Sequence, residues 1–533
     1  MTWIPGSKYV TKKYDRYDGL LTAICFIISL SLYIRTLTPG LLYGDSGEFQ
    51  TLAYLLGHTH PTGYPVYLVL AKLVTFLPLR DVAYRVNLFS ALMAASTVAG
   101  VYLSGRLLVK HRVLALIGAM ALAISPTFWS QAIIAEVYTA GSAFMVLILL
   151  TLLWWDQTNK SLALFLVGIL GGLSLGVHMS VALLAPAVLL FLLLYWRRGI
   201  RIWKVALAGA VTGVIITVTI FGLIDWRNPT ANYFSSVIEP SRSAWGLAAD
   251  EIDGPLERLF FGWSARQFDS FMFADVTIVM PRQAVDYWQN LPHELGLPLV
   301  WLAGFGAVTT LIRRMRVGLL LILGLAIQLF YMFNYEIWDL YVFYIPSYVL
   351  LSILSIVGMG TVMDLGVVAF RQVAFLAQIR WINLALESVI GLLVLGFALW
   401  PVFQPQKEAV LAGEVPFAFD EYPIYDDFIL NSSRAMVINL PENAIVFTDW
   451  DMIWPYYYAA HVIEGRRDLT FIETYPADDV DGIADSVATY VANNLDEHPI
   501  FFDEREPSLL ASGFKFIPTH SGPVRLVRIL DDH

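Results

Sequence analysis

Two carboxylates and two histidines stand close together near the start of the chain, in the stretch GDSGEFQTLAYLLGHTHPTGYP at residues 44–65. Asp45 and Glu48 are three residues apart, a spacing that places both on one face at the start of a helix. Such a pair can act as a general base toward a hydroxyl or hold a divalent cation. The same spacing also matches a capping box, with Asp45 as the N-cap of a helix that ends at Gly57. On spacing alone both interpretations stay open.

His58 and His60 follow in a loop rich in Pro and Gly, where Pro61 restricts His60 to extended backbone. Two histidines at i and i+2 without a third ligand nearby do not favour a zinc site. Hydrogen bonding to a phosphate or a sugar fits them better. An ordinary polar turn at the membrane interface is the alternative.

Other ionisable residues occur singly at the ends of apolar runs. Because burying a charge there is costly, such residues favour a functional interpretation. Glu136 lies in QAIIAEVYTAG, His178 in GGLSLGVHMS, and Asp339 in the aromatic segment NYEIWDLYVFYIP. Arg258 and Arg266, in a long polar loop, have the side-chain type that clamps a phosphate with two hydrogen bonds. Packing, an aromatic belt and contacts with lipid headgroups are the alternatives for these residues.

The elements that must position these residues are membrane helices. The 533 residues are 57% hydrophobic and only 15% charged, whereas a soluble chain carries roughly 25% charged residues. The single cysteine, Cys25, excludes an intramolecular disulfide and a Cys-based zinc site. The N-terminal apolar run is too long for a cleavable signal. Apolar runs of about 17–25 residues predict about eleven spans, at 19–37, 84–108, 113–128, 138–155, 161–177, 181–196, 203–224, 297–312, 317–333, 341–360 and 385–403.

Basic residues in the short loops give the orientation, because loops rich in Lys and Arg stay in the cytoplasm. With eleven spans they all fall on one side: Lys8, Lys12, Lys13 and Arg16, KHR at 110–112, RRGIR at 197–201, RRMR at 313–316, and Arg371 with Arg380. The polar loop 38–83, the long loop 226–296 and the chain after the last span are then outside. We therefore expect an integral protein of the plasma (inner) membrane whose unusual polar residues gather at the extracytoplasmic face.

The chain divides into a membrane domain at 1–404 and a soluble domain at 405–533. The second part holds 8 Lys and Arg against 23 Asp and Glu, so the charge pattern does not favour nucleic-acid binding. Strand-like runs at 444–449, 469–474, 499–504 and 524–530 alternate with helical patterns near 454–464 and 482–495, which predicts a small α/β domain outside the membrane.

Several of these segments together resemble a known family. LTPGLLYGDSGEFQTLAYLLGHTHPTGYPVY at 37–67, AEVYT at 135–139, GLSLGVHMS at 172–180, NYEIWDLYVFYIPS at 334–347 and the tail segment LPENAIVFTDWDMIWPYYYAAHVIEGRRDLTFI at 440–472 resemble the bacterial membrane family named domain of unknown function 2723. That family is similar to an animal transmembrane O-mannosyltransferase and is placed in the GT-C superfamily. The segment TGYP at 62–65 departs from the Pro-Gly-type turn expected after His60.

The resemblance implies an all-α membrane protein of GT-C type that moves a monosaccharide from a polyprenyl-phosphate donor to a hydroxyl of a protein, lipid or glycan, with inversion. Asp45 matches the catalytic carboxylate and Glu48 the second acidic position, and either can be the base. His58, His60, Glu136, His178, Arg258, Arg266 and Asp339 are the candidates for binding the donor phosphate and sugar. No cofactor is required, although a divalent cation between Asp45 and Glu48 is a lesser alternative. A transporter or flippase of lipid-linked sugars and a non-catalytic membrane scaffold stay open as other functions.

Overall fold

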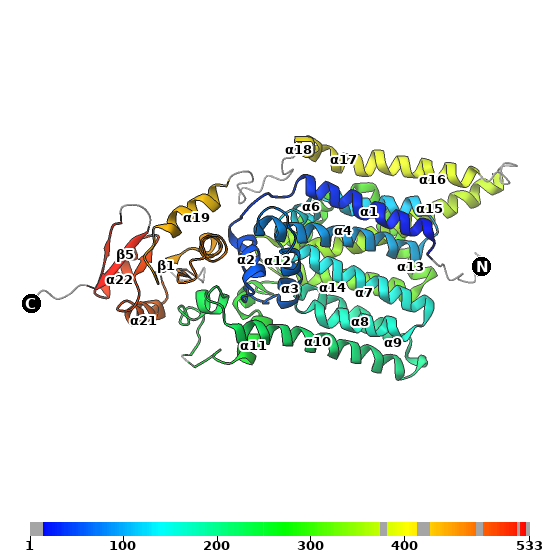
Figure 1. Ribbon diagram of the computed structural model, residues 1–533. Coiled ribbons are helices and arrows are strands. Elements are labelled where there is room, and N and C mark those ends of the chain that lie inside the picture. Colours follow the sequence, from blue (N-terminus) through cyan, green and yellow to red (C-terminus); the bar gives the residue numbers. More distant parts are fainter. Residues whose placement is uncertain are drawn as a thin grey trace, which may run out of the picture.

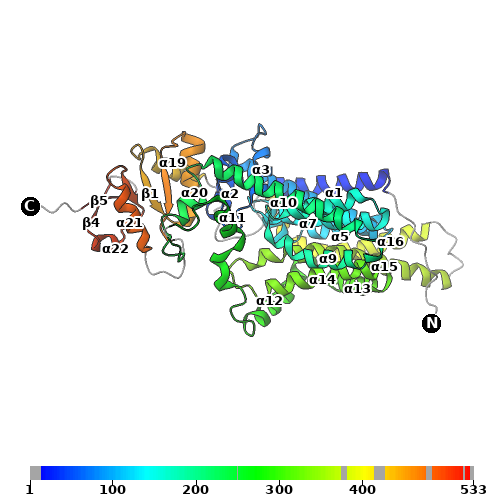
Figure 2. The ribbon, with the colours of Figure 1, turned by 90° about the horizontal axis from the view of Figure 1, so that it is seen from below.

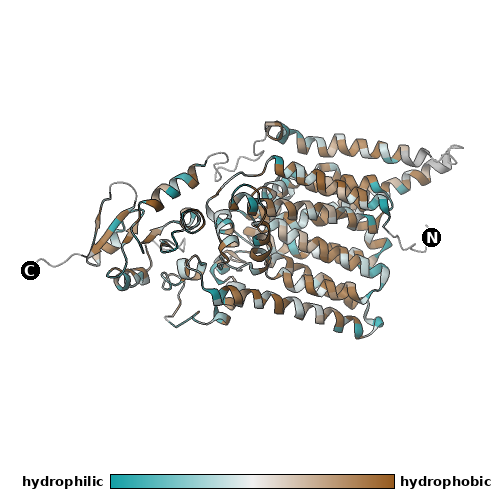
Figure 3. Cartoon of the chain, in the orientation of Figure 1, coloured by the Kyte–Doolittle hydropathy of each residue, from teal (hydrophilic) through white to brown (hydrophobic). Residues whose placement is uncertain are grey.

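Apolar helices run side by side in one bundle, and a small α/β domain lies at one end of it (Figures 1 and 2). The computed structural model describes residues 14–248, 250–373, 381–412, 427–475, 483–519 and 523–528. Coloured by hydropathy, the bundle helices are mainly apolar along their length, whereas polar and apolar residues alternate in the smaller domain (Figure 3). The predicted mostly helical membrane protein with a C-terminal α/β domain is confirmed.

Within the described ranges, seven helices are long and apolar enough to cross a membrane. They are α1 (Arg16–Arg35), α4 (Val82–Leu108), α7 (Tyr138–Thr158), α10 (Arg201–Arg227), α14 (Met315–Met332), α15 (Ile345–Val373, with the turn before it) and the segment from α16 (Trp381–Val394) through α17 (Trp400–Phe403) to α18 (Lys407–Ala412). Two bent pairs raise the number to nine: α5 (Arg112–Ala123) with α6 (Pro126–Ala132), and α12 (Val279–Leu295) with α13 (Leu297–Arg313).

The prediction of about eleven spans therefore exceeds the seven to nine that these helices support. The apolar runs at 161–177 and 181–196 do form helices, α8 (Ser161–Ser174) and the segment Met179–Leu193 that ends in α9 (Ala185–Leu193). At 14 and 15 residues they are shorter than the roughly 17–25 residues that a span needs. Apolar runs in the sequence continue into the turns that end these two helices, which is why the runs appeared longer than the helices are.

Each bend has a local cause. α5 and α6 meet at 68°, because Pro126 cannot continue the hydrogen bonding of the helix before it. The buried Glu294 carboxylate accepts hydrogen bonds there from the Ser125 hydroxyl (2.5 Å) and from the backbone N–H (3.1 Å) and hydroxyl (2.6 Å) of Thr127. α12 and α13 meet at 107° around Gly296, whose φ of 79° is readily adopted by glycine. The Glu294 carboxylate, near the end of α12, thus caps the start of α6.

Glycine allows one pair of helices to pack backbone against backbone. A Cβ on Gly168 of α8 would lie 2.2 Å from the carbonyl oxygen of Ala206 in α10, and a Cβ on Gly209 would lie 2.1 Å from that of Phe165. Small residues at such crossings let membrane helices approach closely where lipid offers no hydrophobic driving force. These glycines hold the short helix α8 firmly against the long helix α10.

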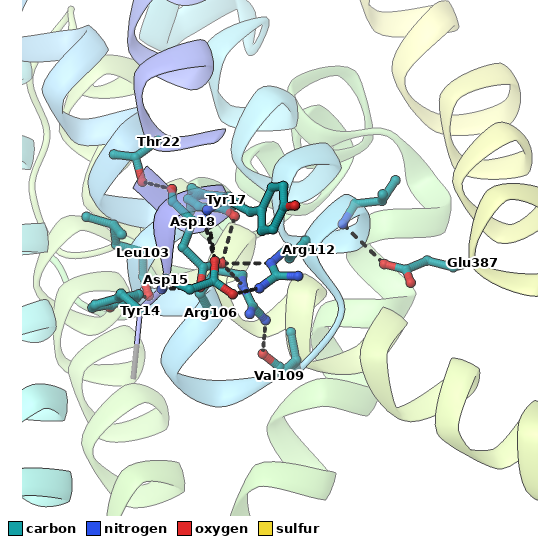
Figure 4. A network of polar contacts seen from close by, with 12 residues as sticks. Tyr14, Asp15, Tyr17, Asp18, Thr22, Leu103, Arg106, Val109, Arg112 and Glu387 are labelled. Atoms are coloured by element: carbon teal, nitrogen blue, oxygen red, sulfur yellow. Dashed lines mark hydrogen bonds and ion pairs between the residues drawn. The ribbon is translucent and has the colours of Figure 1, made fainter. Parts of the chain in front are cut away.

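The end of the bundle near the N-terminus is held by ion pairs (Figure 4). Asp18 of α1 is buried and accepts from Arg106 Nε of α4 (2.7 Å), from Arg112 Nε of α5 (3.2 Å) and from the Tyr102 hydroxyl (3.3 Å). Arg112 also bonds to Asp15, whose carboxylate caps α1. Burying a carboxylate requires such pairing, so this network fixes α1 to α4 and α5.

The basic loops meet at that same end. Arg314 donates to the carbonyl of Leu107 (3.2 Å), Arg316 lies 4.1 Å from the ring centre of Tyr195, and Lys110 pairs with Asp364 (2.8 Å). These contacts bring together three of the predicted basic loops, as the charge pattern requires. Lys8, Lys12, Lys13 and Arg380 lie outside the described residues.

The small domain is built on a five-stranded mixed sheet with the order β2-β1-β3-β5-β4. β1 pairs in parallel with β2 and β3, while β5 pairs antiparallel with β3 and β4. Four strands match the predicted runs, but β4 was not predicted. The elements are β1 (Ile445–Thr448), β2 (Thr470–Glu473), β3 (Ile500–Phe502), β4 (Phe514–Ile517), β5 (Val524–Arg528), α19 (Phe428–Ile438), α20 (Trp450–Tyr457), α21 (Asp485–Asn494) and α22 (Pro507–Ala511).

Both faces of this sheet are buried, for different reasons. Alternate strand residues point to opposite faces. Ile445 and Phe447 pack within the domain against α21, whereas Val446 packs in a core that includes Phe49 and Leu52 of the membrane part. The domain is therefore attached to the bundle by a shared hydrophobic core.

Candidate active site

A cavity of about 570 Å³ lies where the bundle meets the α/β domain. Its ionisable lining residues are Asp45, His60, His178, Asp339 and Glu473. Aromatic residues make much of the remaining wall, among them Tyr64, Tyr138, Tyr233, Trp263, Tyr335, Trp338, Phe343, Trp450 and Tyr475. A cavity with a few convergent polar groups between aromatic walls is the form expected of a ligand site.

Asp45 lies in the first turn of α2 (Gly44–Leu55), which follows directly after the loop from α1. The N-cap is Tyr43 without a side-chain hydrogen bond, and the helix ends at Leu56 in the left-handed conformation. The capping-box prediction is therefore wrong, because the helix begins at Gly44, two residues earlier than an Asp45 cap requires. The Asp45 side chain is 40% exposed, so its carboxylate is available to the cavity.

The Asp45 carboxylate has two polar neighbours. Its Oδ1 accepts a hydrogen bond from the indole Nε1 of Trp450 (2.9 Å), the first residue of α20 in the α/β domain. Its Oδ2 lies 4.0 Å from Nε2 of His60. One oxygen is therefore held by the small domain, while the other faces a histidine of the loop between α2 and α3 (Pro65–Val74).

Glu48 is fully buried and does not line the cavity. Its Oε1 accepts from the backbone N–H of His60 (2.8 Å), and its Oε2 lies 2.5 Å from His60 Nδ1. Burial raises the pKa of Glu48, while the charge of His60 lowers it. Glu48 therefore acts on His60 rather than on the cavity itself.

His60 is the cationic group of this cavity. Burial lowers its pKa, but the Glu48 and Asp45 carboxylates outweigh burial and raise that pKa to about 9. Nδ1 faces Glu48, so Nε2 is directed toward Asp45 and the hydroxyl of Tyr64 (3.5 Å). A protonated imidazole with one nitrogen anchored can offer the other N–H to an anion.

The opposite wall carries Asp339 and His178. Asp339 accepts from the Tyr138 hydroxyl (3.5 Å), and burial, followed by the Asp45 charge, raises its pKa to about 7. His178 stacks on Tyr64 with the ring centres 6.1 Å apart, and burial, followed by the charge of His60, lowers its pKa to about 4. At neutral pH the cavity thus contains one protonated histidine, His60, and one neutral histidine, His178.

Glu136 lies behind Asp45 rather than in the cavity wall. It is buried between α6 and α7, and Ser46 Oγ donates to its carboxylate (3.3 Å). Burial, followed by the Asp45 charge, raises the pKa of Glu136 well above its usual range. A second buried carboxyl group therefore supports the helix turn that carries Asp45.

Besides Glu136, three of the predicted donor-binding residues do not reach the cavity. Arg258 of α11 (Pro255–Ser264) donates two hydrogen bonds to the Asp225 carboxylate, through Nε (2.7 Å) and Nη2 (2.8 Å). His58 is buried against the same carboxylate (3.3 Å), and Arg266 faces Glu251 (3.4 Å) at the surface. These pairings leave the cavity lining without Lys or Arg among the described residues.

The sequence reasoning missed the part that the α/β domain plays. Trp450, Glu473 and Tyr475 line the cavity although they follow Asp45 by more than 400 residues. Trp450 lies in the segment at 440–472 that contributed to the family resemblance, but no role was predicted for it, and Glu473 and Tyr475 follow directly after that segment. Only tertiary packing brings α20 against α2.

In the described part of the chain, no group of three or more His, Cys, Asp or Glu side chains is placed to share a metal ion. Asp45 and Glu48 do not converge, because Glu48 faces His60 from the buried side of α2. The lesser alternative of an ion held between these two carboxylates thus has no third ligand among these residues.

Known proteins resemble both the sequence around the site and the whole fold. The crystal structure of ArnT from Cupriavidus metallidurans bound to undecaprenyl phosphate aligns with this chain with a TM-score of 0.57 and 13% identity. The alignment covers 97% of this chain and 98% of the ArnT chain. The chain has an ArnT-like GT-C fold. The apo oligosaccharyltransferase of Archaeoglobus fulgidus aligns with a TM-score of 0.53 and 14% identity, over 97% of this chain and 75% of its own.

The match to a family model lies in the N-terminal part of this chain. Residues 45–201 match the model for the N-terminal domain of protein O-mannosyl-transferase TMEM260. The TMEM260 proteins of Mus musculus (29% identical over 150 residues, 28% of this chain and 21% of theirs) and Dictyostelium discoideum (26% over 139 residues, 26% and 17%) are similar to it. The chain thus matches about a fifth of the length of these curated relatives. The segment that matches the family model starts at Asp45 and includes His60, Glu136 and His178.

Proposed function

We propose that this protein is an inverting GT-C glycosyltransferase that moves a monosaccharide from a polyprenyl-phosphate donor to an acceptor hydroxyl. The observation that carries the proposal is the pair Asp45 and His60, an exposed carboxylate 4.0 Å from a histidine with a raised pKa, in a cavity with aromatic walls. The Mus musculus and Dictyostelium discoideum relatives are named O-mannosyl-transferases. Mannose is therefore the sugar to test first.

In the proposed reaction Asp45 removes the proton from the acceptor hydroxyl. The acceptor oxygen forms a bond to the anomeric carbon from the side opposite the phosphate, the bond from that carbon to the phosphate oxygen breaks, and the electron pair leaves with the phosphate. The departing phosphate needs stabilisation of negative charge more than it needs an acid. His60 supplies a positive charge within the same cavity, and Glu48 keeps it protonated.

The donor sugar would lie between the aromatic residues and Asp339. Tyr138, Tyr335 and Phe343 surround Asp339, whose carboxyl group can accept or donate a hydrogen bond to sugar hydroxyls. A crystal structure of similar fold holds undecaprenyl phosphate, which supports a lipid-phosphate carrier here. The reaction as written needs no resident cofactor, so chelation with EDTA is expected to leave turnover unchanged.

The orientation belongs to the same proposal. The basic loops meet at the end of the bundle away from the cavity, and basic loops remain in the cytoplasm. The cavity and the α/β domain would then be extracytoplasmic, in the plasma membrane. Protease accessibility of the α/β domain in right-side-out membrane vesicles tests this orientation.

The decisive experiment supplies purified protein with polyprenyl-phosphate mannose and with peptide, lipid and glycan acceptors. Asp45→Asn is expected to lower kcat by about 10³-fold, because a general base contributes roughly 10²–10⁴-fold. Glu336→Gln is a matched control, since this carboxylate pairs with Arg282 at the surface and does not line the cavity. Equal turnover by Asp45→Asn and wild type refutes the base assignment, and transfer of intact donor across vesicles without product favours a flippase.

A further inference from the structure

The α/β domain makes one wall of the proposed active site through the start of α20. Asp449, the last residue before α20, accepts from the backbone N–H of Met452 (2.9 Å) and fixes where the helix begins. This start places the Trp450 ring between three other rings. The ring centres of His60, Tyr233 and Trp454 lie 6.0, 6.2 and 5.9 Å from that of Trp450, each at an angle near 80° or more.

The Trp450 indole N–H is the one hydrogen-bond donor to the Asp45 carboxylate among the described residues. The second neighbour, His60 Nε2, lies 4.0 Å away and is too distant to hold it. The indole is confined by its ring contacts, whereas the carboxylate would otherwise be free to rotate on its exposed side. The orientation of Asp45 therefore depends on a residue of the other domain.

We propose that Trp450 is a positioning residue that makes the base competent only while the α/β domain is docked, an inference that rests on the proposed function. α20 holds the helix of Asp45 as well as its side chain. The Thr51 hydroxyl of α2 donates to the carbonyl of Trp454 (3.1 Å), and Phe49 and Leu52 share a core with Ile453 and Trp454.

Further contacts join the same segment to other parts of the membrane domain. The backbone N–H of Ala83, in α4, donates to the hydroxyl of Tyr458 (3.1 Å). The Tyr457 hydroxyl lies 2.9 Å from Ser236 Oγ, in the long loop after α10. Because these contacts surround Trp450, a displacement of the domain withdraws the indole from Asp45.

The test compares Trp450→Phe with Trp454→Phe. Both lose an indole N–H from α20, but that of Trp454 is buried without a hydrogen-bond partner and so makes no contact to lose. We expect Trp450→Phe to lower kcat by about 10²-fold, as misplacement of a catalytic group by about 1 Å does. KM for the donor should stay within about threefold of the wild-type value, and Trp454→Phe should lower kcat much less than Trp450→Phe does, because its phenyl ring keeps the contact with Trp450.

Trp450→His, which keeps a ring N–H, should recover part of the lost kcat. Equal kcat in the two Phe variants, with wild type active, overturns the inference and leaves the proposed function intact. Inactivity of wild type with every polyprenyl-phosphate sugar overturns the proposed function instead.

A second measurement does not depend on turnover. Melting temperatures of Trp450→Phe, Asp45→Ala and the double variant form a cycle in which residues that share a hydrogen bond give non-additive shifts. The double variant should melt no lower than the less stable single variant. Additive shifts would overturn the inference even if no substrate had been found.

Discussion

Replacing Glu48 by Gln tests the charge state of His60 most directly. The pKa of His60 is about 9 against an ordinary value of 6.5, and this difference corresponds to about 3 kcal/mol of preference for the protonated form. Glu48→Gln keeps an amide oxygen that can accept from the backbone N–H of His60, but it removes the negative charge beside Nδ1. We therefore expect the pKa of His60 to fall from about 9 toward 6.5, because burial is then opposed mainly by the charge of Asp45.

The consequence for turnover follows from the two pKa values. At about pH 8 a histidine of pKa 9 is mostly protonated, whereas one of pKa 6.5 is only about 3% protonated, so kcat of Glu48→Gln should fall by up to about 30-fold. The alkaline limb of the profile of kcat against pH should move from near 9 toward 6.5.

The stability of the folded protein should also depend on pH through His60. Because the folded pKa of His60 is raised, its stabilising contribution is complete below about pH 6.5 and is lost as pH rises through about 9. The apparent melting temperature of wild type should fall across this window, and that of Glu48→Gln should fall less. Glu257→Gln, which loses a charge at the surface start of α11, is the control. If the alkaline limb of Glu48→Gln coincides with that of wild type, the assignment of the positive charge to His60 is refuted.

Two other substitutions separate structural from substrate-binding roles. Arg258→Met should lower the free energy of unfolding by about 3 kcal/mol, since it leaves the largely buried Asp225 without its bidentate partner. KM for the donor should stay unchanged. A raised KM at unchanged stability would instead place Arg258 on the phosphate. Asp339→Asn should raise the melting temperature above about pH 7, because the raised pKa of Asp339 makes its ionised form costly in the folded state. The same variant should raise KM for the sugar donor by about tenfold, the value of one hydrogen bond to a charged group, and an unchanged KM would remove Asp339 from the sugar site.

The sequence predicted the cavity residues that lie at the ends of apolar runs. Asp45, His60, His178 and Asp339 all follow or precede such runs on the same side of the predicted bundle, and the folded chain brings them to one cavity. Sidedness is readable from sequence because a helix reverses it with each crossing and basic loops mark one face. The strands of the tail were readable for a similar reason, since Val446 and Phe447 alternate with the period of a sheet whose two faces are both buried.

Hydrogen-bond partners that are distant in the sequence could not be predicted from apolar runs and residue spacing. Arg258 was expected to bind phosphate, but Asp225, 33 residues earlier, occupies its guanidinium. Trp450 is 405 residues from the carboxylate it contacts, and no periodicity or spacing rule connects two such positions. The N-terminus of α2 was misplaced by two residues because Gly44 adopts a positive φ of 58° within the first turn.

The ion pairs at the end of the bundle away from the cavity join α1 to helices that are synthesised after it. α1 carries Asp18 near its start, and only 22% of its most apolar window is buried in the finished fold. The partners of Asp18 are Arg106 and Arg112, 88 and 94 residues later. Until α4 and α5 have been made, the hydrogen bonds to that carboxylate come from the backbone N–H of Asp15 and from water. The ion-paired position of α1 is therefore completed only after the segment that carries Asp45 has been synthesised.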